Sequence, residues 1–174
     1  MLSGLLDANG GKVVRELRTQ LGSKLSLLGN EGFTPISQLL QIAGEAGKGM
    51  YVSLNGLTVE RLSPSGRAFA TAFAATQPSA DIQPTAIYAA QAAEVLLDAI
   101  ARSDGTRASV IRELFRTDVE DGFLGDFTFD ANGDISESPV TILRALGRGG
   151  SNTIQSFEGA EIVGVERPQA SLVR

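Results

Sequence analysis

The first 54 residues alternate between short apolar runs and amphipathic helical patterns, and this alternation restricts the fold more than any other feature. Runs at 2–6, 24–28 and 50–54 have the length and apolar content of buried strands. Between them lie two segments, 13–21 and 35–46, whose apolar residues recur at three- and four-residue intervals, as on one face of a helix. Strand, helix, strand, helix, strand is the pattern of an α/β layer built on a parallel sheet.

The pattern changes at residue 55, from which turn residues cluster as far as residue 66 and indicate a crossover or a hinge. The segments beyond it are predicted to form three helices, at 66–75, 85–102 and 107–116. The last part of the chain is predicted as β-structure, with strands at 123–129, 140–143, 153–157 and 161–165. The first two of these strands are expected to form a hairpin around a tight turn at 130–134, because Asn132-Gly133 is a strong hairpin signal.

The composition disfavours several classes of function. A net charge of -5 argues against nucleic-acid binding, because proteins that bind nucleic acid present clustered cations. The chain contains no His and no Cys, so it lacks the commonest general base, thiol nucleophiles and zinc–thiolate sites. We therefore expect no metal site, no cofactor and no catalytic residue. No apolar run approaches the ~18 residues of a membrane helix. The chain begins within a strand pattern and shows no leader, so we expect part of a longer protein.

Glu31 is the first candidate binding residue. It follows the apolar run that stops at Gly29, and it precedes Thr34 and Pro35, which are expected to cap the next helix and to occupy its first position. Glu31 should therefore lie on the loop after the carboxyl end of a central parallel strand. In open parallel sheets, ligands bind in the crevice outside such ends. The alternative is a solvated carboxylate that is favoured by the dipole of the following helix.

The segment 130–134 begins like a calcium loop, with acidic or amide side chains at Asp130, Asn132 and Asp134. The rest of the calcium pattern is absent. Ile135 stands where the loop requires Gly, and Thr141 stands where it requires a bidentate Glu. We therefore interpret this segment as a hairpin turn.

Two other patterns are interpreted without a ligand. The glycine-rich segment 147–150 is not followed by the Lys-Ser/Thr pair or the helix of a phosphate-binding loop, so it is predicted to be a linker. Two pairs of cations at helical spacing are interpreted as solvated helix faces: Arg15 with Arg18, and Arg112 with Arg116.

Four segments taken together resemble a known protein family. They are 28–33 (Leu-Gly-Asn-Glu-Gly-Phe), 43–52 (Ala-Gly-Glu-Ala-Gly-Lys-Gly-Met-Tyr-Val), 88–93 (Tyr-Ala-Ala-Gln-Ala-Ala) and 122–134, which runs from Gly-Phe-Leu-Gly-Asp to Asp-Ala-Asn-Gly-Asp. In this order and spacing they resemble the C-terminal half of type I periplasmic (extracellular) solute-binding proteins. Within that family, the chain most resembles the Leu/Ile/Val (branched-chain amino acid) substrate-binding proteins of ABC transporters. The resemblance implies an α/β fold of the type I periplasmic binding protein kind, with flavodoxin-like parallel sheets flanked by helices, present here as a partial chain.

The family's two lobes are joined by three crossing segments, and the resemblance assigns this chain to parts of both lobes. Residues 1–57 would form part of the C-terminal lobe, and residues 58–137 part of the N-terminal lobe. Residues 138–174 would form a crossover and return strands to the C-terminal lobe. The family's first half is missing here, so this chain alone cannot form the complete cleft. It is expected to fold as a half, to rearrange into one sheet, or to pair with a second copy as a homodimer.

The resemblance implies binding without chemistry. The protein would be an extracellular or periplasmic receptor that captures a small solute, an amino acid or a related compound, and presents it to an ABC permease after lobe closure. A ligand-sensing domain of a receptor or regulator with the same fold is one alternative. A flavodoxin-like enzyme with a carboxylate base is the other, and the absence of His and Cys disfavours it.

The resemblance also implies site residues. Glu31 would accept the ligand's ammonium group, and Phe33 would form an apolar wall unless it packs in the core. Asp7 and Asn9 lie on a loop that reaches the ligand in relatives, although we prefer a helix-capping role for Asn9. Tyr88 is a further candidate, with packing of its ring and a hydroxyl at the rim as the preferred alternative.

Overall fold

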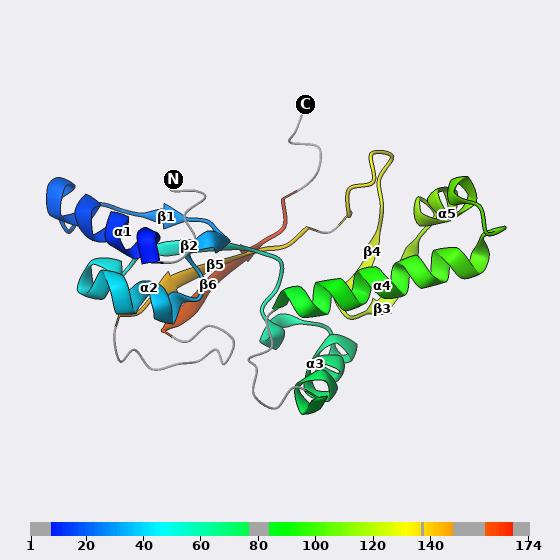
Figure 1. Ribbon diagram of the computed structural model, residues 1–174, viewed down its shortest axis with the longest axis horizontal. Helices are drawn as coiled ribbons and strands as arrows, with labels where there is room; N and C mark the ends of the chain where they lie inside the picture. Colours follow the sequence, from blue (N-terminus) through cyan, green and yellow to red (C-terminus); the bar gives the residue numbers. More distant parts are fainter. Residues whose placement is uncertain (1–7, 77–83, 137, 148–158, 169–174) are drawn as a thin grey trace. The chain divides into compact units, whose positions relative to one another are not determined.

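The computed structural model describes residues 8–76, 84–136, 138–147 and 159–168, and these residues divide into two compact units (Figure 1). Unit 1 contains the described residues within Met1–Gly56 and Val140–Glu166. Unit 2 contains those within Leu57–Pro139 and Arg167–Arg174. The chain therefore crosses between the units three times. The assignment of these units to the two lobes of the family stays a prediction.

Unit 1 contains a mixed four-stranded sheet in the order β1-β2-β5-β6. Its strands are β1 (Leu28–Gly29), β2 (Tyr51–Asn55), β5 (Val140–Ala145) and β6 (Ala160–Glu166). The pair β1–β2 is parallel, whereas β2–β5 and β5–β6 are antiparallel. Among the described strands β1 lies at the edge, and it is shorter than the predicted strand at 24–28. The strands predicted at 2–6 and 153–157 lie outside the described residues.

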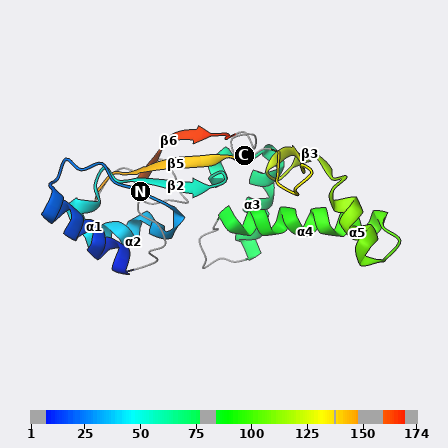
Figure 2. The same ribbon diagram turned by 90° about the horizontal axis from the view of Figure 1, so that it is seen from above.

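Two helices cover the same side of this sheet, as Figure 2 shows. They are α1 (Ala8–Leu21) and α2 (Ile36–Ala43), and both agree with the helical periodicity of the sequence. Short 3-10 turns lie at η1 (Glu31–Phe33) and η2 (Gly44–Gly47). The apolar side chains of α2 recur at positions i, i+3, i+4 and i+7, so one face of the helix is buried against the sheet. The core cluster of the unit consists of Val14, Leu27, Phe33, Ile36, Leu39, Leu40, Ala43, Met50, Val52, Leu54, Leu143, Ala145 and Ala160.

Arg18 differs from its interpretation as part of a solvated helix face. Its guanidinium donates hydrogen bonds to the carbonyls of Ser23 (2.7 Å) and Leu25 at the end of α1, and to those of Ala46 (3.2 Å) and Lys48 (3.4 Å) near η2. The side chain therefore holds two loops that are distant in sequence. Arg15 is exposed, in agreement with its interpretation.

Unit 2 contains three helices and a two-stranded hairpin among its described residues. The helices are α3 (Pro64–Thr76), α4 (Pro84–Arg102) and α5 (Arg107–Leu114), preceded by a 3-10 turn, η3 (Val59–Arg61). All three helices were predicted from the sequence. No helix among the residues that the structure describes combines the length and the apolar content that crossing a membrane requires.

The hairpin of unit 2 pairs β3 (Asp118–Gly122) with β4 (Gly125–Thr128). The strand predicted at 123–129 is present as β4, which begins two residues later because the chain turns at Phe123, whereas β3 was not predicted. That turn packs on the start of α3. A Cβ atom added to Gly66 would lie 2.1 Å from the carbonyl oxygen of Phe123, so only glycine allows this approach. The hydroxyl of Ser63 lies 2.7 Å from the carbonyl oxygen of Gly122 and also accepts the Gly66 N–H.

The tight turn at 130–134 is confirmed, but the hairpin expected around it is wrong. Among the described residues, the chain beyond the turn returns to β4 through a single bridge between Phe129 and Ile135, and the predicted returning strand pairs instead with β2 and β6 in unit 1. The carboxylate of Asp130 accepts the backbone N–H groups of Asn132 (2.8 Å) and Asp134 (2.9 Å). These bonds lower the pKa of Asp130. The side chain thus stabilises the turn through its own backbone, as the interpretation without calcium requires.

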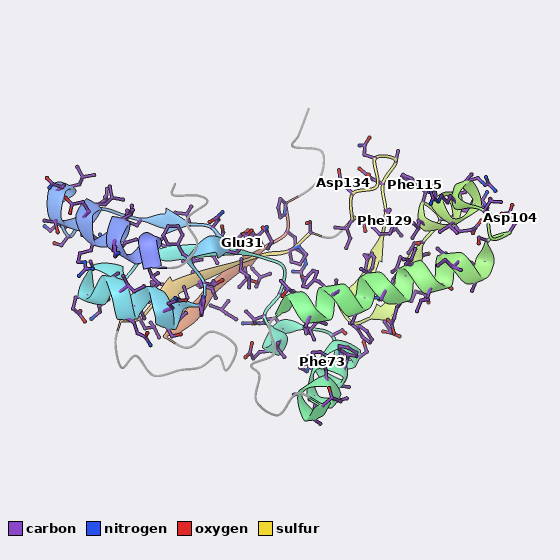
Figure 3. All side chains as sticks on the ribbon, viewed as in Figure 1. Glu31, Phe73, Asp104, Phe115, Phe129 and Asp134 are labelled. Atoms are coloured by element: carbon purple, nitrogen blue, oxygen red, sulfur yellow. The ribbon has the colours of Figure 1, made fainter. Side chains whose placement is uncertain are left out.

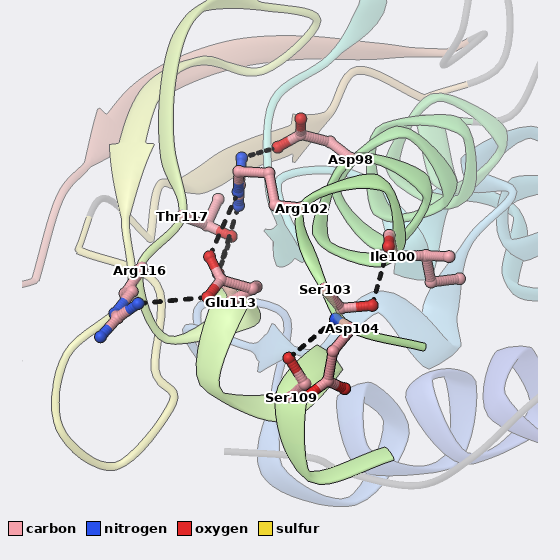
Figure 4. Close-up of polar contacts among 9 residues, drawn as sticks. All are labelled: Asp98, Ile100, Arg102, Ser103, Asp104, Ser109, Glu113, Arg116 and Thr117. Atoms are coloured by element: carbon pink, nitrogen blue, oxygen red, sulfur yellow. Dashed lines mark hydrogen bonds and ion pairs between the residues drawn. The ribbon is translucent and has the colours of Figure 1, made fainter. Parts of the chain in front are cut away.

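The far end of α4 and the helix α5 are linked by ion pairs that meet at the half-buried Glu113 (Figure 4). Arg102 pairs with Asp98 and lies 3.5 Å from Glu113, which also pairs with Arg116 at 3.1 Å. Arg112 and Arg116 lie on the exposed surface, as interpreted from the sequence, and exposed ion pairs of this kind contribute little to stability.

Candidate functional site

The strongest candidate site lies at the carboxyl ends of β1 and β2. Glu31 lies two residues after the end of β1, and Asn55 is the last residue of β2. Because these two strands are parallel, their carboxyl ends meet at the same edge of the sheet. The side-chain amide of Asn55 donates a hydrogen bond to Oε1 of Glu31 at 3.4 Å, and both side chains are exposed (Figure 3 marks Glu31). The edge therefore presents a carboxylate, held from one side by an amide.

The loop around Glu31 is fixed by local hydrogen bonds. The side-chain oxygen of Asn30 accepts the Gly32 N–H at 3.2 Å and caps η1. The hydroxyl of Thr34 donates to the carbonyl of Glu31 at 2.6 Å. The predicted capping of α2 by Thr34 is therefore wrong. Pro35 occupies the cap position of α2, and the peptide bond between Thr34 and Pro35 is cis.

Phe33 packs in the core of unit 1, where only 4% of its side chain is exposed. Its ring lies against Gly29, since a Cβ atom there would be 2.5 Å from the ring and 2.7 Å from the methyl of Met50. The alternative given for Phe33, core packing, therefore describes its position. The residue also borders a shallow hollow whose lining is Gly32, Phe33, Thr34, Pro35, Gln38 and Leu39. A contact between Phe33 and a ligand stays a prediction.

Asp7 and the side chain of Asn9 lie outside the described residues, so their predicted role near the ligand stays a prediction. The backbone of Asn9 is described, and it is the second residue of α1. The preferred capping role for Asn9 would place it before the first helical residue, so the position of Asn9 inside the helix does not support that role.

Tyr88 belongs to α4 in unit 2, whereas Glu31 and Asn55 belong to unit 1. The Tyr88 hydroxyl accepts a hydrogen bond from the backbone N–H of Leu57 at 2.9 Å. Burial raises the pKa of Tyr88 above its ordinary value, and the bond from Leu57 lowers it by a smaller amount. Tyr88 is therefore a neutral phenol whose hydroxyl is hydrogen-bonded to the backbone of Leu57, the first residue of unit 2.

Asn55 is a residue of the candidate site that sequence reasoning missed. A signal existed, because a polar residue directly after the predicted strand at 50–54 occupies the same edge as Glu31. The segment was assigned instead to the start of the crossover. The hydrogen bond between Asn55 and Glu31, which are 24 residues apart, follows from the parallel pairing of β1 and β2. The sequence pattern alone does not give the register of that pairing.

The residues that the structure describes include no group of three or more acidic side chains that could hold a metal ion. Among the described residues, Glu31 and Asn55 give this edge a carboxylate and an amide. A carboxylate binds a cation or an ammonium group through charge-assisted hydrogen bonds, and the neighbouring amide fixes its orientation.

Comparison with known proteins identifies the architecture. Residues 4–150 match the family model that is described as "periplasmic binding protein". Among curated protein sequences, none matches this chain.

Three solved structures illustrate the similarity of fold. A leucine-binding protein from Thermotoga maritima has a TM-score of 0.70 and 23% identity, with 95% of this chain and 44% of that protein covered. A branched-chain amino acid transporter substrate-binding protein from Streptococcus pneumoniae, solved with isoleucine, has a TM-score of 0.62 and 22% identity, with 95% of this chain and 43% of that protein covered. A fatty acid ABC transporter substrate-binding protein from Thermomonospora curvata has a TM-score of 0.65 and 20% identity, with 94% of this chain and 41% of that protein covered. The chain thus spans less than half the length of these proteins, and the predicted fold class is confirmed.

Proposed function

This chain belongs to the periplasmic binding protein family, and we propose that the full-length protein captures a small amino acid or a related amine for an ABC permease. Its two lobes would close on the solute, and the permease would recognise the closed form. Such closure is a shift between two populations, set by the contacts that the ligand makes in each. The protein would act outside the cytoplasm, and the binding would involve no catalysis and no cofactor.

The arrangement of Glu31 and Asn55 carries this proposal. Their hydrogen bond occupies Oε1 of Glu31, and the exposed carboxylate keeps further acceptor positions for a ligand. An ammonium group is the complementary partner. A charge-assisted hydrogen bond to it becomes stronger as a closing cleft excludes water.

Under this proposal, the same carboxylate would distinguish between the ligand classes that relatives are described as binding. Structural neighbours include proteins described as binding leucine, isoleucine or fatty acids. A fatty acid carries a carboxylate and no cation, so Glu31 would repel it, whereas an amino acid brings an ammonium group to the same place. The exposed acid at this edge therefore favours amine-bearing solutes.

A thermal-shift panel on the full-length protein tests the proposal. The panel contains leucine, isoleucine, valine, polar and acidic amino acids, and decanoate as a fatty acid. We expect at least one amino acid to raise the melting temperature, because a ligand that binds only the folded state stabilises it. Glu31→Gln should weaken this shift, and Glu45→Gln, which removes another exposed carboxylate of unit 1, should preserve it.

Two results would contradict the proposal. One is a protein that responds only to compounds without an amine. The other is a Glu31→Gln variant whose response to the amino acid equals that of the unaltered protein.

A further inference from the structure

The tetrapeptide Asp-Ala-Asn-Gly occurs twice in this chain, at 7–10 and at 130–133. A further Asn-Gly pair, Asn55-Gly56, lies at the end of β2. Asn-Gly is the pair in which asparagine loses ammonia most readily, because glycine has no side chain to keep its backbone nitrogen from the neighbouring amide carbon. The sequence therefore offers three candidates for the same reaction, and two of them have the same local sequence.

The reaction joins the glycine backbone to the asparagine side chain. The glycine nitrogen gives up its proton to base and attacks Cγ of the preceding asparagine, and the new C–N bond closes a succinimide ring. The C–N bond of the side-chain amide breaks, and its nitrogen takes up a proton from water and leaves as ammonia. Water then opens the ring at one of its two carbonyl carbons, which gives aspartate or isoaspartate. The glycine nitrogen must therefore be accessible, and the backbone must be free to turn toward Cγ.

The copy at 7–10 enters a helix. Asn9 and Gly10 are the second and third residues of α1, and Gly10 is buried. The helix is closely packed here, since a Cβ atom added to Gly11 would lie 2.6 Å from Cβ of Ile42 on α2. Helical backbone torsions do not allow the ring to close, so the start of α1 must open before Asn9 can react.

The pair Asn55-Gly56 is held by the sheet of unit 1. Asn55 pairs with Val140 across β2 and β5, and Gly56 is buried. The carbonyl oxygen of Gly56 accepts a hydrogen bond from the Thr141 hydroxyl at 2.6 Å. Ring closure at Asn55 therefore requires the end of β2 to separate from β5. It would also replace the amide that donates to Glu31 by a second carboxylate.

The copy at 130–133 lies in an exposed turn of unit 2, where both Asn132 and Gly133 are exposed. The Gly133 N–H donates to the carbonyl of Asp130 at 3.1 Å, and the side-chain amide of Asn132 lies 3.5 Å from the Asp130 carboxylate. These contacts join residues of the same turn, so their loss requires no separation of helices or strands. Exposed turns open locally at a small cost in free energy.

We propose that Asn132 is the site at which this protein deamidates in its folded state, and that the fold spares Asn9 and Asn55. An isoaspartate at this position adds a methylene to the main chain between Asp130 and Asp134. The Asp130 carboxylate accepts the Asp134 N–H at 2.9 Å, so the longer main chain should break the turn. The modification would change unit 2 locally and leave the candidate binding site intact.

Peptide mapping of this chain after incubation at mildly alkaline pH tests the proposal. Trypsin places the three asparagines in separate peptides, 1–12, 49–61 and 117–144. Mass spectrometry with fragmentation that distinguishes aspartate from isoaspartate then measures the rate at each site. In the folded chain, Asn132 should react at least roughly tenfold faster than Asn9 or Asn55, because those two must await local unfolding. In guanidinium chloride, Asn9 and Asn132 should react at similar rates, because their tetrapeptides are identical.

A pair of variants tests the hold of the turn on Asn132. Asp130→Ala removes the acceptor of two backbone N–H groups, and should raise the rate at Asn132 toward its value in the unfolded chain. Asp104→Ala removes a carboxylate that accepts the Thr106 N–H in another exposed turn of unit 2, and should leave that rate unchanged. An equal effect of the two variants would contradict opening of the turn as the limiting step.

Two results would overturn the proposal itself. One is a folded chain in which Asn132 reacts no faster than Asn9 or Asn55. The other is the same ranking of the three sites in the folded and the unfolded chain, since the sequence and not the fold would then direct the reaction. This comparison needs no variant, so it decides the question even if Asp130→Ala fails to fold.

Discussion

The two units of this chain are stabilised in different ways. Unit 1 contains the whole of the main apolar core cluster, in which two helices and a sheet bury Ile36, Met50 and Leu143 completely. Unit 2 buries apolar side chains such as Leu62, Ile87 and Phe127 together with the polar Gln91 and Thr117, and it exposes further apolar side chains on α4 and α5. Those exposed side chains are Leu96, Leu97, Ile100, Ile111 and Phe115.

The contrast shows that close backbone approach and polar contacts add to apolar burial in unit 2, where part of the apolar surface of the helices is exposed. In unit 2, the serines and glycine at the start of α3 hold the hairpin turn, and Gln91 accepts the Leu124 N–H at 3.4 Å. A layer of helices normally buries its apolar stripes against a sheet. The pairing with a second copy stays a prediction.

The largest expected effect comes from a matched pair of leucine truncations in this chain. Leu143→Ala removes a side chain with 0% exposure from the centre of the unit 1 sheet, and should lower the free energy of unfolding by about 2–5 kcal/mol. Leu97→Ala removes a side chain with 65% exposure in unit 2, and should change it by less than about 0.5 kcal/mol. Urea unfolding followed by circular dichroism measures both. Equal losses in the two variants would remove the contrast between the units.

The next effect concerns the close approach in unit 2. Gly66→Ala places a methyl group against the Phe123 carbonyl, and should destabilise unit 2 by about 1–3 kcal/mol, in the range for overpacking. Gly164→Ala on β6 is the control, because its added methyl would meet nothing closer than 3.6 Å. Hydrogen exchange of the amides in β3 and β4 reports the change locally. Unaltered protection of that hairpin in Gly66→Ala would show that the approach is dispensable.

A third effect tests whether unit 1 depends on polar contacts as well. Arg18→Met keeps the aliphatic stem but removes the donors to the carbonyls of Ser23 and Ala46, and should cost about 1–3 kcal/mol. Arg15→Met, at an exposed position of the same helix, should cost much less. Thermal unfolding compares the two. Similar melting temperatures would mean that the Arg18 contacts add nothing to the core.

The smallest effect is a titration in unit 2. The backbone bonds from Asp134 and Asn132 lower the pKa of Asp130 below its ordinary value of 3.8. The ionised form is favoured by folding, so its contribution to stability is present above pH 3.8 and is lost as the pH falls through the lowered pKa. Carbon-detected NMR of the carboxyl group should give a midpoint below 3.8. A midpoint at or above that value would contradict the turn geometry.

Local periodicity predicted most of the helices, but it did not predict contacts between segments that are distant in sequence. The residues of α2 and α4 repeat at helical intervals, so both helices were predicted within two or three residues of their bounds. The strand β3 was missed because its sequence, Asp-Val-Glu-Asp-Gly, is polar and lacks β-branched runs. The role of Arg18 was missed because two of its acceptors are backbone carbonyls 28 and 30 residues away, which no side-chain pattern marks.

The candidate site shows the same limit. The position of Glu31 after an apolar run sufficed to predict a loop at the carboxyl end of a parallel strand. The partner of that carboxylate, Asn55, depends on the register between β1 and β2, and register arises from packing of the whole sheet. Thr34 satisfied the sequence rule for a helix cap, yet its hydroxyl bonds backward to Glu31 because η1 intervenes before α2.

Calorimetry with leucine and 4-methylpentanoate, which has the same carbon skeleton without the amine, tests most directly whether Glu31 selects an ammonium group. We expect the full-length protein to bind leucine and to show no measurable binding of 4-methylpentanoate. We also expect Glu31→Gln to raise the Kd for leucine by roughly 10- to 100-fold, since a hydrogen bond to a charged group contributes about 1.5–3 kcal/mol. Equal affinity for the two compounds, or an unchanged Kd for leucine in Glu31→Gln, would contradict the role given to this carboxylate.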